Sequence, residues 1–124
     1  ALAEGSGWEY CPKIRATTDT TGRVMLCDFF GTQMWVEYGI EVEEAGTYEL
    51  LVRHSNITDG SFTFSVDNNS LSHTFAKTNE IGAADVWKTD KIEGFNLSQG
   101  KHILRVALTN GRANFNWMCL RKTN

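Results

Sequence analysis

Apolar and polar residues alternate one by one along several short segments of this sequence, and this alternation limits the possible folds more than any other feature. In residues 36–42 the apolar side chains take the even positions, while the odd positions carry Glu or Gly. The same alternation returns in residues 48–52, 62–66 and 102–108. Because successive side chains of a strand point to opposite faces, each segment predicts a strand with one buried and one solvated face.

Turn-forming residues between these segments predict how the strands are connected. Residues 43–46 have the turn-like sequence Glu-Glu-Ala-Gly, so we expect 36–42 and 48–52 to pair as a hairpin. Residues 67–70, with the sequence Asp-Asn-Asn-Ser, predict a turn after 62–66.

The dipeptide Asn110-Gly111 is the strongest short-range hairpin signal in the chain. We expect it to join the strand 102–108 to a partner strand at 114–120. Short strands about ten residues apart, with turn residues between them, are typical of two packed sheets. The sequence therefore predicts an all-β fold, a two-sheet antiparallel β-sandwich, formed by residues 1–124 as a single domain.

Charge and hydropathy argue against two classes of partner. The chain has 12 basic and 15 acidic residues and a net charge of −3, and its basic residues form no run. Nucleic-acid binding depends on clustered cations, so we expect no nucleic-acid partner. No apolar stretch approaches the roughly 20 residues of a membrane-spanning helix, so we expect no membrane partner.

The three cysteines have no C-x-x-C spacing, so they indicate neither a zinc site nor thioredoxin-like chemistry. Cys11, Cys27 and Cys119 are either three small, partly buried apolar residues, or one disulfide with a free thiol, and the sequence does not select the pair. The sequence opens without a cationic and apolar leader, so we expect any export signal to have been removed or to lie upstream.

No arrangement of residues predicts catalysis. His54, His73 and His102 each stand alone in a strand-like segment, and we expect solvated side chains rather than bases. The carboxylates of residues 41–44 lie at a predicted turn, whereas a glycosidase needs two carboxylates facing each other across a cleft. We therefore expect a non-catalytic protein whose binding site lies in the loops at one end of the sandwich or on a sheet face.

Six short motifs follow one another along the chain: Ala3-Glu4, the threonine-rich run 17–22, Trp35-Val36-Glu37-Tyr38, Ala45-Gly46-Thr47-Tyr48, the run 96–102, and Asn114-Phe115-Asn116-Trp117. In this order and near this spacing, they resemble the family-six carbohydrate-binding modules. These are non-catalytic β-sandwich domains attached to polysaccharide-degrading enzymes. The resemblance runs almost from end to end and implies a jelly-roll form of the sandwich.

The resemblance also implies a saccharide site in the loops at one end, called cleft A, where two aromatic rings grip a sugar. A pyranose presents an apolar face of C–H bonds, which suits a flat ring. The first ring corresponds to Phe29, with Phe30 as the neighbouring candidate. The second corresponds to Trp87, unless Trp87 is the family's packing residue and Ala84 takes the stacking position. Two more aromatic candidates have no family counterpart: Trp8 and Tyr10.

Three polar residues are implied in the same cleft. Asn114 corresponds to the family's asparagine that bonds sugar hydroxyls. Where many members carry a glutamate, this chain has Arg15. A guanidinium donates hydrogen bonds but does not accept them, which allows a preferred sugar other than a xylan or cello-oligosaccharide end. Asp28 is the candidate acceptor in its place.

A structural calcium ion is common in the family where the first and last strands meet. Calcium takes about six to eight oxygen ligands and prefers carboxylates. Glu4 and Asn116 match ligand positions, and backbone carbonyls near Asp19 and Gly22 could contribute. Leu2 replaces a usual ligand and cannot coordinate. The resemblance therefore implies a structural calcium ion.

The implied function is that of a secreted, monomeric module that binds a polysaccharide or oligosaccharide and keeps a covalently linked glycoside hydrolase near its substrate. A pocket-like cleft favours chain ends, and we rank agarose, β-1,3-glucans and xylan together as candidate glycans. The family's second site, on the concave sheet face, has no assignable residues here. The alternative is an adhesion or protein-interaction β-sandwich without sugar affinity. It requires Phe29, Phe30 and Trp87 to be buried or to form a flat apolar patch.

Overall fold

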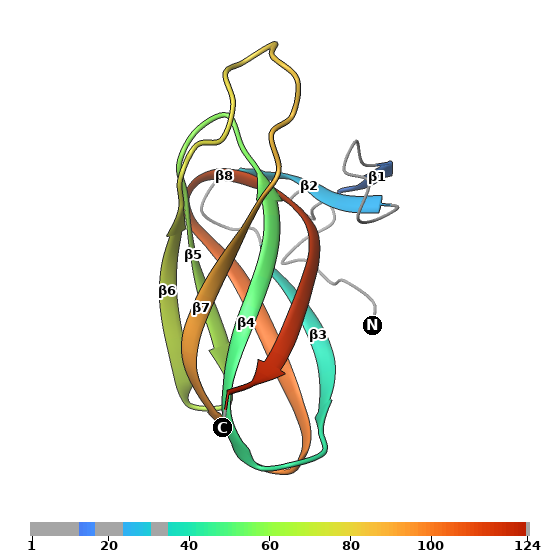
Figure 1. Cartoon of the computed structure of the whole chain (residues 1–124), viewed down its shortest axis with the longest axis vertical. Coiled ribbons are helices and arrows are strands. Elements are labelled where there is room, and N and C mark those ends of the chain that lie inside the picture. The colour runs from blue at the N-terminus through green and yellow to red at the C-terminus, as the bar shows by residue number, and fades with distance from the viewer. Residues whose placement is uncertain (1–12, 17–23, 31–34, 124) are drawn as a thin grey trace.

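In this computed structural model, the described residues form eight strands (Figure 1). The structure describes residues 13–16, 24–30 and 35–123, with side chains from residue 35 onward. No helix in these ranges has the length and apolar character needed to cross a bilayer. The strands are β1 (Lys13–Ala16), β2 (Val24–Phe30), β3 (Trp35–Val42), β4 (Gly46–Ser55), β5 (Gly60–Val66), β6 (Asn69–Phe75), β7 (Lys88–Leu97) and β8 (Gly100–Lys122).

The long strand β8 belongs to two sheets and joins them. Its first half lies between β3 and β5, and β6 follows β5, so that sheet B has the order β3-β8-β5-β6. Its second half lies between β2 and β4, so that sheet A has the order β1-β2-β8-β4-β7. Figure 1 shows β8 curving from one layer to the other. All of these pairings are antiparallel, which confirms the predicted two-sheet sandwich.

The predicted hairpin between residues 36–42 and 48–52 is wrong. Strand β3 pairs with β8 in sheet B, while β4 pairs with β7 and β8 in sheet A. The turn after Val42 therefore carries the chain from one sheet to the other. Alternation shows which side chains face the core. The pattern is the same whether two strands pair in one sheet or lie in facing sheets, so it does not predict the pairing.

The hairpin predicted at Asn110-Gly111 is also wrong, because β8 continues through both residues. Gly111 has a φ angle of 77°, and a Cβ atom there would collide with the backbone carbonyl of Asp59. This left-handed residue lies where β8 passes from sheet B to sheet A, and residues 114–120 pair with β4. The turn predicted after Val66 is confirmed, since Asp67, at a φ angle of 54°, lies between β5 and β6.

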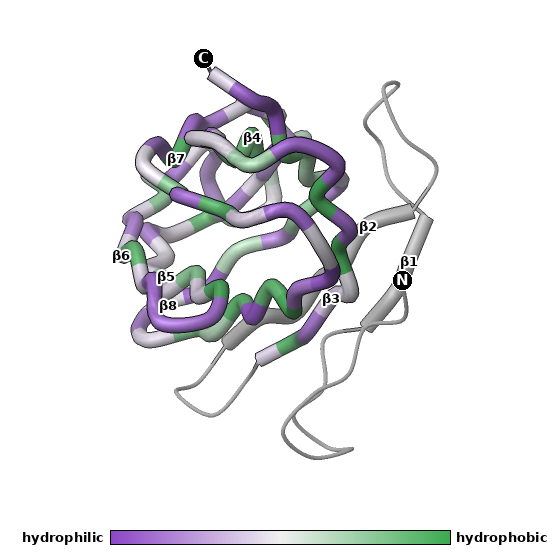
Figure 2. Tube along the Cα trace, turned by 90° about the horizontal axis from the view of Figure 1, so that it is seen from below, coloured by the Kyte–Doolittle hydropathy of each residue, from purple (hydrophilic) through white to green (hydrophobic). Residues whose placement is uncertain are grey.

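The core lies between the facing sides of the two sheets. The rings of Phe62, Phe75 and Phe115 meet there, with centroid separations from 4.8 to 5.7 Å. Along the tube in Figure 2, hydrophobic and hydrophilic residues alternate, as the sequence predicts for strands with one buried face. The even positions of the predicted strands are buried or half-buried at Val36, Tyr38, Ile40, Val42, Leu50, Val52, Phe62, Phe64, Val66, Leu104, Val106 and Leu108.

Candidate functional site

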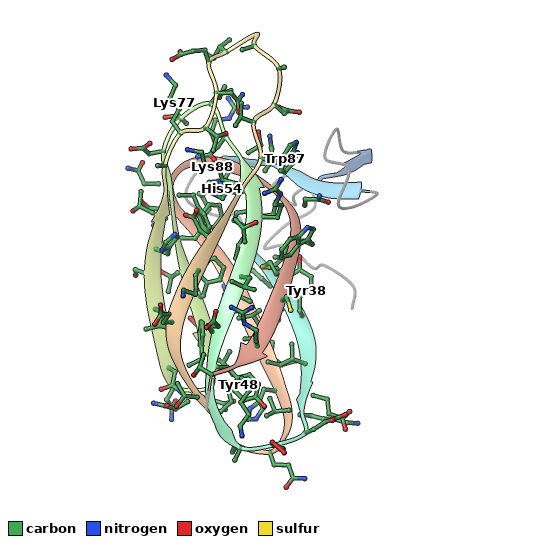
Figure 3. The ribbon with its side chains drawn as sticks, in the orientation of Figure 1. Tyr38, Tyr48, His54, Lys77, Trp87 and Lys88 are labelled. Carbon is green, nitrogen blue, oxygen red and sulfur yellow. The ribbon has the colours of Figure 1, made fainter. Side chains whose placement is uncertain are left out.

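Several of the predicted saccharide-binding residues meet at one end of sheet A. In the register of β4 and β8, Ser55 is the partner of Asn114. Strand β7 begins beside this point, one residue after Trp87, and Figure 3 shows Trp87 near the upper end of β4. On the other side of β8, the backbone of Phe29 pairs with Ala113. We call this end of sheet A the loop end.

Two of the predicted saccharide-binding residues at the loop end have described side chains, and both are accessible to solvent. Trp87 and Asn114 are both half-buried. The backbone of Phe30 pairs with Arg112, so the backbones of Phe29 and Phe30 both lie at the loop end. Their side chains lie outside the described residues. Ala84 is exposed in the same loop as Trp87, and its methyl group offers no ring for stacking.

The predicted Arg15 and Asp28 occupy different places in sheet A. Arg15 lies in β1, where it pairs with Met25, so β2 separates it from β8. Asp28 lies in the irregular stretch of β2 between Leu26 and Phe29, directly beside the loop end. Only the backbone of these residues is described, so their roles toward a sugar stay predictions.

A polar network at the loop end was not predicted from the sequence. The backbone carbonyl of Asn56 accepts hydrogen bonds from the backbone N–H groups of Thr78 and Asn79, at 2.8 and 3.2 Å. The side-chain amide of Asn56 donates to the carbonyls of Thr58 and Phe75, at 2.6 and 3.0 Å. These bonds attach the loop of residues 76–87 to the end of β4. Polar residues directly after an apolar strand are the sequence signal for such a network.

The expectation that the histidines are isolated and solvated is wrong for all three. The side chain of His102 is 7% exposed and lies 2.7 Å from the carboxylate of Asp67. His54 and His73 share another carboxylate. His54 is only 1% exposed. Nε2 of His54 and Nε2 of His73 lie 2.9 and 2.8 Å from the two carboxylate oxygens of Asp90. His54 continues the inward register of Leu50 and Val52, so the alternation of β4 already indicated its burial. Desolvation acts to raise the pKa of Asp90, but the hydrogen bonds and charges of His73 and His54 outweigh it and lower this pKa.

The calcium prediction rests mostly on residues outside those the structure describes, namely Glu4, Asp19 and Gly22. Asn116 is described and lies in β8, where the register with β4 shifts between Trp117 and Phe115. Within residues 35–123, no cluster of three or more His, Cys, Asp or Glu side chains could hold a metal. The amide of Asn116 can supply one ligand of a calcium site, but it does not form a site without further ligands.

A second aromatic surface lies on the outer face of sheet B. The guanidinium of Arg105 stacks over the ring of the half-buried Trp35, 4.1 Å from its centroid. A shallow depression of about 490 Å³ lies on this face, lined in part by Glu37, Lys101 and Arg105. Trp35 and Glu37 both occupy odd positions of β3, on the face that alternation predicts to point away from the core. The sequence therefore already indicated an outward indole. Sequence reasoning missed it because Trp35 served only as a family landmark.

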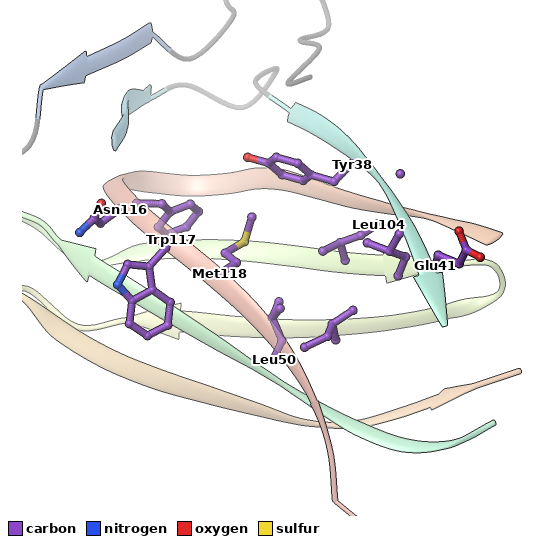
Figure 4. A pocket seen from close by; sticks show the side chains of 11 residues that line it. Tyr38, Glu41, Leu50, Leu104, Asn116, Trp117 and Met118 are labelled. Carbon is purple, nitrogen blue, oxygen red and sulfur yellow. The ribbon is translucent and has the colours of Figure 1, made fainter. Parts of the chain in front are cut away.

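An apolar opening of about 470 Å³ separates the edges of the two sheets (Figure 4). Tyr38 on β3 faces Met118 on β8 across it, and Leu50 and Leu104 form its floor. Burial raises the pKa of Tyr38 to about 12. Because the lining consists largely of core side chains, we do not assign a saccharide to this opening.

The side chain of one of the three cysteines is described. Cys119 is an exposed free thiol in β8, so it is not partly buried as one interpretation expected, and it takes part in no disulfide.

A family model places this antiparallel two-sheet sandwich in a class, the non-catalytic carbohydrate-binding modules. More specifically, the model of the carbohydrate binding module family 35 matches residues 12–120, and the chain belongs to this family. The predicted class is therefore confirmed, whereas the matching family model is that of family 35 rather than family six.

Solved structures share the fold over nearly the whole chain. The family-six module CBM6cm-2 of Cellvibrio mixtus lichenase 5A, in complex with cellotriose, has 25% sequence identity and a TM-score of 0.74, with 98% of this chain and 91% of that chain covered. Xyl-CBM35, in complex with a disaccharide containing glucuronic acid, has 20% identity and a TM-score of 0.78, with coverage of 100% and 91%.

A third similar structure is the cycloalternan-forming enzyme from Listeria monocytogenes, in complex with a pentasaccharide substrate. It has 19% identity and a TM-score of 0.73, and the match covers 97% of this chain but 12% of that chain. No curated protein matches the sequence.

Proposed function

We propose that this module binds a polysaccharide at the loop end, with Trp87 as a stacking platform and Asn114 as a hydrogen-bonding partner of sugar hydroxyls. One observation carries the proposal: the register of β4, β7 and β8 places the half-buried Trp87 at the same end as Asn114. A flat ring and a fixed amide are the groups that a pyranose requires. Phe29 or Phe30, at the end of β2, supplies the second ring.

The solved complexes support a saccharide ligand, since one contains cellotriose and another a disaccharide with glucuronic acid. For this chain we propose the agarose, β-glucan or xylan class. A site among loops at the end of a sandwich has room for a terminal sugar more readily than for the middle of a chain, so we propose recognition of chain ends.

The biological role that we propose is targeting of a covalently linked glycoside hydrolase outside the cell. The match to 12% of the Listeria monocytogenes enzyme supports an arrangement in which such a domain is one part of a larger catalytic protein. Tethering raises the effective concentration of the enzyme at its substrate even when each site binds weakly. The module acts as a monomer, and a calcium ion near Asn116 stabilises it.

The outer face of sheet B is a second candidate saccharide site, because Trp35 and Arg105 form an accessible stacked pair there. A sugar ring could pack against this pair, with Glu37 and Lys101 as hydroxyl partners. This face suits a longer stretch of chain than the loop end does.

Affinity gel electrophoresis with soluble polysaccharides of the three classes, in the presence of calcium, tests the proposal. We expect at least one polysaccharide to retard the protein. Trp87→Ala and Asn114→Ala should each weaken binding about tenfold. Trp35→Ala removes the same indole from the other surface and is the matched comparison.

The outcomes separate the two surfaces. If no polysaccharide retards the wild-type protein, saccharide binding is wrong for this chain. If Trp35→Ala abolishes retardation and the loop-end variants do not, the ligand binds to the face of sheet B instead.

A further inference from the structure

Asn79 occupies an unusual place in the loop of residues 76–87. The residue is 9% exposed, although the loop around it is mostly exposed. Its carbonyl oxygen Oδ1 accepts hydrogen bonds from the hydroxyl of Ser55 at 3.0 Å and from the backbone N–H of Val86 at 3.3 Å. The hydroxyl of Thr78 also lies 2.7 Å from this oxygen. One buried acceptor therefore joins the end of β4 to both ends of the loop.

Two of the groups that donate to Oδ1 of Asn79 lead directly to the proposed sugar-binding residues. Val86 is the residue before Trp87, and Ser55 is the register partner of Asn114. The chain of hydrogen bonds from Val86 through Asn79 to Ser55 thus connects the backbone beside the indole to the strand beside the amide. The first part of the loop has its own anchor, because Thr78 and Asn79 donate backbone N–H groups to Asn56.

We propose that Asn79 is a positioning residue for saccharide binding, which holds Trp87 in place relative to Asn114. This inference rests on the proposed function of the loop end. Without the acceptor, the Val86 N–H and the Ser55 hydroxyl lose their partner, and the end of the loop that carries Trp87 gains conformational freedom. Binding must then order that segment, and the cost lowers the affinity.

The test is isothermal titration calorimetry with the polysaccharide that retards the wild-type protein most strongly. We expect Asn79→Ala to weaken binding about tenfold. Asn79→Asp retains an acceptor of the same shape and should recover most of the affinity. As a control, Thr47→Val removes a side-chain hydrogen bond of the same length, to Asn96 at the opposite end of the molecule, and should leave the affinity unchanged.

A double-mutant cycle distinguishes positioning from a general loss of structure. If Asn79 acts through the indole, Asn79→Ala should cause no further loss in the Trp87→Ala background, because the group that it positions is already absent. A purely structural role predicts that the two losses add. Should Asn79→Ala not fold, Ser55→Ala removes one donor of the same network and takes its place in the cycle.

The results separate this inference from the proposed function. If Trp87→Ala weakens binding but Asn79→Ala binds as wild type, or if the two losses add, the positioning role is wrong and the site stands. If Trp87→Ala binds as wild type, or no polysaccharide binds, the site itself is wrong and the positioning role falls with it.

Discussion

Nε2 of the buried His54 lies 2.9 Å from the carboxylate of Asp90 on the neighbouring strand β7. The second oxygen of this carboxylate contacts His73 on β6, so Asp90 connects three strands from both sheets. The pKa of Asp90 is lowered, because the two histidines outweigh the effect of burial. A carboxylate with a lowered pKa stabilises the fold above its ordinary pKa of 3.8, and this contribution is lost as the pH falls through the folded-state value.

We therefore predict that Asp90→Asn destabilises the protein by about 1–3 kcal/mol near neutral pH, with a smaller effect in acid. Urea denaturation near pH 7 and near pH 3 measures both values. Glu43→Gln removes a carboxylate from an exposed turn and should change the stability by less than about 0.5 kcal/mol. An Asp90→Asn variant as stable as wild type at neutral pH would show that the two histidines do not depend on this carboxylate.

His102 links two turns at the opposite end of the molecule. Its Nε2 lies 2.9 Å from the backbone carbonyl of Ser98, and its Nδ1 lies 2.7 Å from the carboxylate of Asp67. The hydrogen bond to Ser98 has the largest effect and raises the pKa of His102. Desolvation acts in the opposite direction, and the contact with Asp67 adds to the increase. When it is protonated, the imidazole ring of His102 can donate a hydrogen bond to each of these two acceptors.

Because this pKa is raised, the stabilisation from His102 should be fully present below its ordinary pKa of 6.5 and lost as the pH rises through the folded-state value. We predict a melting temperature that falls in the wild type as the pH rises above the ordinary pKa of 6.5, and a flatter profile for His102→Gln. Asp67→Asn should flatten it in part. The same slope in wild type and His102→Gln would assign the pH dependence to other groups.

The sequence predicted the strands and their inward faces better than the pairing of the strands. Alternation along β3 and β4 correctly gave the buried positions, since it depends only on side-chain direction. The partner of each strand depends on long-range packing, which alternation does not encode, and so the hairpin through residues 43–46 was wrong.

The candidate site, like the fold, was predicted from the sequence only in part. Asn114 was predicted from its motif and Trp87 from the context of its loop, and the register brings both to one end of sheet A. Asn79, by contrast, stands in a polar loop with no motif. Its importance comes from burial and from donors that lie 24 and 7 residues away in the sequence. No local pattern contains that information.

Tyr38 gives a test at alkaline pH. Burial raises the pKa of its hydroxyl to about 12, against an ordinary value of 10.0. Above pH 10 the unfolded chain releases this proton more readily than the folded chain, so the stability should fall as the pH rises toward about 12. We predict that Tyr38→Phe reduces this loss in urea denaturation, whereas Tyr48→Phe leaves it unchanged. Equal losses in all three proteins would contradict the burial of the Tyr38 hydroxyl.

Removal of calcium tests the proposed structural ion. If an ion binds near Asn116, a chelator should lower the melting temperature of the wild type by about 5 °C or more. Asn116→Ala should reduce this difference, because it removes a ligand, while Asn68→Ala, in an exposed turn, should not. A melting temperature that is insensitive to chelator would argue against a bound calcium ion in this chain.

Gly111 is the position where the path of the backbone most restricts the sequence. Its φ angle of 77° is unfavourable for residues with a Cβ atom, and such an atom would collide with the backbone carbonyl of Asp59. Since β8 joins the two sheets here, its backbone cannot shift without disturbing its hydrogen bonds in one sheet or the other. We predict that Gly111→Ala lowers the free energy of unfolding by about 3 kcal/mol or more, measured by urea denaturation.

Gly39→Ala provides the matched control for this strand-crossing position. Gly39 lies in β3 outside the left-handed region and is exposed, and a Cβ atom there would have no neighbouring atom within 4 Å. This substitution should therefore change the stability by less than about 0.5 kcal/mol. If Gly111→Ala were as mild as Gly39→Ala, the chain could not pass through residue 111 in a left-handed conformation. The hairpin that Asn110-Gly111 predicts would then have to be reconsidered, together with the continuity of β8 between the sheets.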